Sequence, residues 1–116
     1  MVSELEINIA EKVREIHGPR MWEEGDRYIH DEQVLFVGKF HYSGAIVTPH
    51  EDSLWLPTQM DYMDLLWEID ADRFILADDG VYEGETHYEG DTWTFKYDNR
   101  YDSPREAWWR VINNDG

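Results

Sequence analysis

The residues best suited to metal chemistry are His41 and His50, with Glu51 and Asp52 directly after the second histidine. Imidazole nitrogens and carboxylate oxygens are common ligands of zinc and other transition metals. The two histidines are nine positions apart, and no third ligand follows at a fixed spacing. This pattern is typical of solvated loop histidines, so the sequence predicts no metal site.

A second group of candidate residues consists of Asp70, Asp72, Asp78 and Asp79. Two carboxyl groups in unlike environments could divide the roles of general acid and general base. A calcium loop counted from Asp70 would need glycine at its sixth position and glutamate at its twelfth, and both are absent. The chain also lacks cysteine, a phosphate-binding loop and the usual hydrolase motifs. We therefore expect no catalytic residues and no cofactor; a metal-assisted hydrolase that uses His50 and neighbouring carboxylates stays an alternative.

The strongest signal in the chain is the charge of residues 50–91. This stretch holds thirteen carboxylates and a single basic residue, Arg73, interleaved with six aromatic residues. It therefore carries −12 of the chain's net charge of −16. The aromatic residues give this stretch enough apolar surface to fold, while nearly all of the charges that it exposes to solvent are negative. A sequence pI of about 4.4 argues against direct contact with nucleic acid or an anionic membrane, and favours a cationic partner.

The length of 116 residues predicts a single domain over residues 1–116 with one modest core. No signal peptide and no apolar run of membrane-spanning length is present, so we expect a soluble cytoplasmic protein. Only three of the ten basic residues are lysine. That composition leaves a housekeeping domain from a salt-loving organism as an alternative.

Helix signals begin the chain, and strand signals follow. Ser3 and Glu6 form a capping box, and the apolar stripe after them predicts a helix over residues 3–17. Strands are expected within residues 27–48, the last of them over residues 45–48. The continuous apolar run 34–37 is predicted to be the most buried strand.

The second half repeats this alternation with clearer boundaries. Thr58 and Asp61 predict the start of a helix over residues 59–69. Two glycine-containing turns then divide residues 73–97 into a three-stranded meander whose Trp93, Phe95 and Tyr97 are expected on the helix-covered face. A last helix is predicted over residues 104–113, after Ser103 and Pro104. The class is therefore α+β, in the order α-β-β-β-α-β-β-β-α, with helices on an antiparallel sheet.

Two motifs of the second half carry a resemblance. The segment 55–66, WLPTQMDYMDLL, and the helix entry 102–107, DSPREA, are similar to segments of small uncharacterised acidic proteins of phages and prophages. The similarity covers about residues 53–112. The meander followed by a helix is also similar to the ending of HicB-type antitoxins. This resemblance implies an accessory protein of a virus or mobile element, and it carries over no catalytic residues.

These observations predict a non-enzymatic acidic protein that binds a basic surface of another protein. The alternative within the same class is a nucleic-acid mimic, whose carboxylates stand in for phosphates and block a DNA- or RNA-binding protein. Tryptophans rimmed by acids suit the recognition of arginine or lysine. The residues predicted to steer and anchor the partner are Asp61, Asp64, Glu68, Asp70, Asp72, Asp78, Asp79, Trp67 and Trp109.

Overall fold

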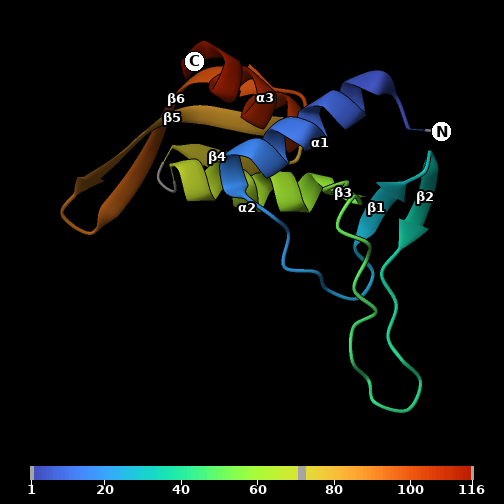
Figure 1. Cartoon of the computed structure of the whole chain (residues 1–116). Helices are drawn as coiled ribbons and strands as arrows, with labels where there is room; N and C mark the ends of the chain where they lie inside the picture. Colours follow the sequence, from blue (N-terminus) through green and yellow to red (C-terminus); the bar gives the residue numbers. More distant parts are fainter. Residues whose placement is uncertain (1, 71–72, 116) are drawn as a thin grey trace. The chain divides into compact units, whose positions relative to one another are not determined.

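The computed structural model describes residues 2–70 and 73–115 of the chain (Figure 1). It confirms the α+β class and the predicted order of helices and strands. The strands form two antiparallel sheets of three strands each, rather than one continuous sheet. One sheet belongs to a compact unit over Met1–Pro57 (unit 1), and the other to a compact unit over Thr58–Gly116 (unit 2). None of the described helices is long and apolar enough to cross a membrane.

Unit 1 consists of helix α1 (Glu4–His17) and strands β1 (Arg27–His30), β2 (Gln33–Phe36) and β3 (Leu54–Trp55), in the sheet order β2-β1-β3. The predicted cap is confirmed, because Ser3 Oγ accepts a hydrogen bond from the Glu6 backbone N–H at 3.1 Å. The buried face of α1 is centred on Ala10, which forms a core cluster with two leucines of the β3 region, Leu54 and Leu56.

The strand predictions for unit 1 were wrong in two places. The apolar run 34–37 was expected to be the most buried, but all of β2 is exposed, with Phe36 at 67%, and only Val37 is buried. Residues 45–48 form no strand, only a single bridge between Lys39 and Ile46, and the third strand is β3. An apolar run is buried only where another element covers it. β2 lies at the edge of its sheet, while α1 packs on β3.

Unit 2 consists of helix α2 (Gln59–Ile69), strands β4 (Phe74–Ala77), β5 (Gly80–Glu89) and β6 (Thr92–Tyr101), and helix α3 (Pro104–Asp115). The predicted start of α2 is confirmed, with the Thr58–Asp61 capping box complete. The two helices pack on each other through Tyr62 and Trp108, whose rings lie 6.0 Å apart and are both buried. The expected meander is present in the order β4-β5-β6, although β6 runs to residue 101.

A β-bulge decides which face of this sheet the helices cover. Glu83 pairs with Asn99 and Gly84 with Tyr97, so that Asp98 is an extra residue in β6. One extra residue exchanges the two faces of a strand. Tyr101 therefore lies on the buried side, at 8% exposure, whereas Tyr97 is 59% exposed and Trp93 is 70% exposed. The prediction that Trp93, Phe95 and Tyr97 lie under the helices was wrong because the alternation reverses at the bulge.

Gly84→Ala tests the bulge. A Cβ atom at this position would lie 2.0 Å from the Lys96 carbonyl oxygen and 2.5 Å from Tyr97 Cα, so the two strands would have to separate. We expect the free energy of unfolding to fall by at least about 2 kcal/mol, measured by urea denaturation. Gly38→Ala is the matched control, because a Cβ there meets nothing within 4 Å; an equal loss in both variants would contradict the close approach.

The turn between β1 and β2 offers a stabilising change. Asp31 and Glu32 have φ angles of 49° and 66°, the pattern of a type I′ turn, which favours glycine at its second position. We expect Glu32→Gly to raise the free energy of unfolding by about 1 kcal/mol. Glu51 also lies in a turn but has no positive φ, so Glu51→Gly should have no stabilising effect. A lower denaturation midpoint for Glu32→Gly would contradict the turn type.

Candidate partner-binding surface

The face of the unit 2 sheet that is turned away from the helices is lined by aromatic side chains. Neighbouring rings contact each other across and along the strands: Tyr82 and Tyr97 have centroids 4.5 Å apart, Tyr88 and Trp93 4.8 Å, and Phe95 and Tyr97 6.3 Å. These five residues define the open sheet face. Cross-strand aromatic pairs of this kind stabilise a hairpin even where no core covers it.

The open sheet face is also accessible to water. Tyr88 is 56% exposed, and Tyr97 and Trp93 are more exposed still. Figure 1 shows the outer end of the β5–β6 hairpin extending past α2 and α3. A monomeric protein rarely leaves a continuous group of large rings in water unless the group has a binding role. The open sheet face is therefore the strongest candidate for a partner-binding surface.

The helix α2 carries four of the predicted residues. Asp61 is held in the capping box, where its Oδ2 accepts hydrogen bonds from the Thr58 backbone N–H and hydroxyl, both at 2.9 Å. Asp64 and Glu68 are one helical turn apart and exposed, and Trp67 beside them is 43% exposed. The structure thus brings together one predicted ring and two predicted acids.

The other predicted acids lie apart from this helical group. Asp70 caps the end of α2, and Asp78 and Asp79 form the turn between β4 and β5. Asp79 is already engaged: it accepts a hydrogen bond from the Tyr82 hydroxyl at 2.8 Å and lies 3.5 Å from Arg100 Nε. The Tyr82 hydrogen bond, with help from Arg100, lowers the pKa of Asp79 below its usual value. Asp72 lies outside the described residues.

The second predicted anchor, Trp109, is half-buried on α3, while its neighbour Trp108 is fully buried. Adjacent residues of a helix point about 100° apart, so the two rings cannot share one environment.

The two histidines considered as metal ligands have different neighbours. The His50 Nδ1 atom accepts a hydrogen bond from the Asp52 backbone N–H at 3.2 Å, whereas the His41 ring packs on Tyr42 at 5.1 Å. Within residues 2–70 and 73–115, no three His, Asp or Glu side chains are placed to hold a metal ion.

Sequence reasoning missed a buried acid on the helix-covered side of the sheet. Glu83 is 8% exposed; it forms an ion pair with Arg73 and accepts a hydrogen bond from the Tyr101 hydroxyl at 2.5 Å. Burial, and then the hydrogen bond to Glu83, raises the pKa of Tyr101 to about 12. The signal in the sequence was the alternation from Val81, which places Glu83 on the inward face.

Arg73 and Glu83 also line a hollow of about 550 Å³ in unit 2, together with the polar residues Asp70, Glu85, His87, Asp98 and Asn99. The outer half of the hairpin therefore has one polar face and one aromatic face.

Comparison of the chain with protein-family models, with curated proteins and with solved structures found no match.

Stability at alkaline pH tests the contact of Glu83 with Tyr101. The pKa of Tyr101 rises from 10.0 to about 12 on folding, so the folded protein holds this proton longer than the unfolded chain does. The contribution is complete below pH 10 and is lost as the pH rises through 12. We expect Tyr101→Phe to lower the free energy of unfolding by about 1–3 kcal/mol at neutral pH and to flatten its decline above pH 10.

Chemical denaturation across that pH range gives both quantities. Tyr42→Phe is the control, because Tyr42 is fully exposed and its replacement should leave the pH profile unchanged. An identical profile for Tyr101→Phe and the unsubstituted protein would contradict the buried contact.

Proposed function

We propose that this chain is a non-enzymatic, acidic interaction protein that binds a basic surface of a partner protein, and that the partner docks on the open sheet face. One observation carries the proposal: five aromatic side chains lie on the sheet face opposite the helices of unit 2, in a group of three and a pair, and three of the five are largely exposed to water. Large rings in such a group are the residues that most often dominate binding energies at interfaces.

The charge of unit 2 argues for a cationic partner. Its residues 58–116 include fifteen acids against five arginines and lysines, a net charge of −10. Such a field accelerates the encounter with a basic surface and repels an acidic one. Glu89 and Asp91 are both exposed at the hairpin tip, next to the Tyr88–Trp93 pair. Carboxylates at the edge of an aromatic surface favour arginine, which can stack on a ring while its N–H groups reach the acid.

The remaining parts of the proposal rest on the sequence. The similarity of residues 53–112 to small phage and prophage proteins supports an accessory role in a mobile element, which would act in the cytoplasm of its host. The exposed Asp64 and Glu68 of α2 would add to the steering field.

Binding of a peptide of alternating arginine and serine, followed by calorimetry, tests the docking surface. We expect Trp93→Ala to weaken binding about tenfold, which corresponds to about 1.4 kcal/mol, because it removes the most exposed ring of the five. Trp67→Ala is the matched control: it removes the exposed tryptophan of α2 and should leave the affinity unchanged.

Three results would contradict the proposal. Loss of binding in Trp67→Ala with full binding in Trp93→Ala would place the docking surface on α2. If the unsubstituted protein did not bind the peptide at low salt, the proposal of a cationic partner would be wrong. Equal loss of affinity on neutralisation of any of the acids, with no effect of Trp93→Ala, would instead indicate the nucleic-acid mimic, which is read as distributed charge.

A further inference from the structure

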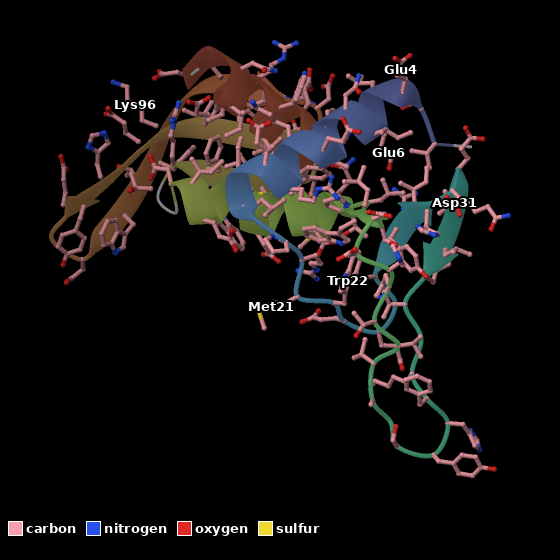
Figure 2. All side chains as sticks on the ribbon, viewed as in Figure 1. Glu4, Glu6, Met21, Trp22, Asp31 and Lys96 are labelled. Carbon is pink, nitrogen blue, oxygen red and sulfur yellow. The ribbon has the colours of Figure 1, made fainter. Side chains whose placement is uncertain are left out.

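Unit 1 contains a partly open cavity between the second half of α1, the loop after it and the segment that leads into β3. Its volume is about 180 Å³. Buried apolar side chains line the cavity, among them Val13 of α1 and Leu54 of β3. The tryptophans Trp22 and Trp55 also line it. Figure 2 shows Trp22 on the loop after α1, with Met21 beside it pointing away from the ribbon.

Two polar atoms of residues that line this cavity are buried without a hydrogen-bond partner among the described residues. They are the Ser53 hydroxyl oxygen and the Trp55 indole nitrogen, and Ser53 as a whole is only 5% exposed. The indole N–H can only donate, and a hydroxyl can donate as well. Because buried polar groups are nearly always paired in folded proteins, both atoms indicate an occupant with hydrogen-bond acceptors.

The arginines beside the cavity favour an anionic occupant. Arg20 is already paired: its Nε and Nη2 atoms donate to Asp26 at 3.0 and 3.1 Å, and its guanidinium lies 4.0 Å from the centre of the Trp55 ring. This arrangement fixes one wall of the cavity. Arg14 also lines the cavity and is exposed, and its side chain has no hydrogen bond or ion pair within the part of the chain that the structure describes.

We propose that this cavity binds a small aromatic carboxylate, of about the size of benzoate. The carboxylate accepts hydrogen bonds from Ser53 and Trp55 and faces the charge of Arg14, and the ring lies among the apolar side chains and the indoles. Such a combination of an apolar lining and a few convergent polar groups is typical of small-molecule sites. The exposed Glu51 also lines the cavity and opposes an anion, so the anionic preference depends on the hydrogen bonds from Ser53 and Trp55 and on the charge of Arg14.

Titration with benzoate, and with benzamide as its uncharged counterpart, tests this site by NMR. The readout is the indole N–H signal of Trp55, which is assigned by its loss in Trp55→Phe. We expect benzoate to shift this signal saturably and to bind about tenfold more tightly than benzamide. Ser53→Ala and Arg14→Gln should each weaken benzoate binding about tenfold, because each removes one of the groups that receive the carboxylate.

Arg110→Gln is the matched control, since Arg110 is an exposed arginine of unit 2 and its loss should leave the affinity unchanged. Thermal unfolding without ligand confirms that each variant is folded. Ser53→Ala should be at least as stable as the unsubstituted protein, because the hydroxyl that it removes has no partner. A Trp55 signal that does not respond to benzoate would show that water alone fills the cavity. If the protein bound benzoate and benzamide with equal affinity, the proposal of an anionic ligand would be wrong. The same conclusion would follow if neither Ser53→Ala nor Arg14→Gln changed the affinity for benzoate.

Discussion

The close approach of β5 to β6 at Gly84 is the constraint on which the second half of the molecule depends. No side chain larger than hydrogen fits between Gly84 and the backbone of Lys96 and Tyr97, and the bulge at Asp98 occurs at this point. A bulge changes which residues of a strand face the core. It places Tyr101 beneath the helices and leaves the rings before it on the opposite side, where the β5–β6 pairing supports them but nothing in unit 2 covers them.

The two faces of this sheet follow from that exchange. On the covered face, the carboxylate of Glu83 is accommodated because Arg73 and Tyr101 both pair with it; an unpaired buried charge would be strongly destabilising. On the open face, the rings of the hairpin contact one another and remain in water. The net charge of −10 in this half produces electrostatic repulsion between copies of the chain, and the same field would favour the basic partner that we propose. Exposed rings and excess acid are thus compatible in one small fold.

Unit 1 has few elements that can cover its sheet, and this limits how much apolar surface it can bury. It has one helix for three strands, so the core is a small cluster around Ala10, Leu54 and Leu56, and the apolar edge strand β2 stays in water. Part of its organisation comes from polar contacts instead. Arg20 joins Asp26 to the ring of Trp55, and Arg27 joins β1 to Glu6 of α1. A core of this size leaves a cavity in whose wall the Ser53 hydroxyl and the Trp55 indole nitrogen have no hydrogen-bond partner among the described residues.

The sequence by itself determined what depends on neighbours along the chain. Ser3, Thr58 and Ser103 mark the starts of three helices, because capping is a contact over three residues, and glycine-containing turns mark the meander of unit 2. The sequence identified the acids that were predicted to bind a partner, but it did not predict their contacts. In the structure, Asp61 caps α2, and Asp79 accepts a hydrogen bond from Tyr82 and lies beside Arg100. Only the tertiary structure decided which apolar residues are buried. That outcome depends on a bulge that reverses one strand's alternation and on how many elements are available to cover each face, and both are relations between residues distant in the sequence.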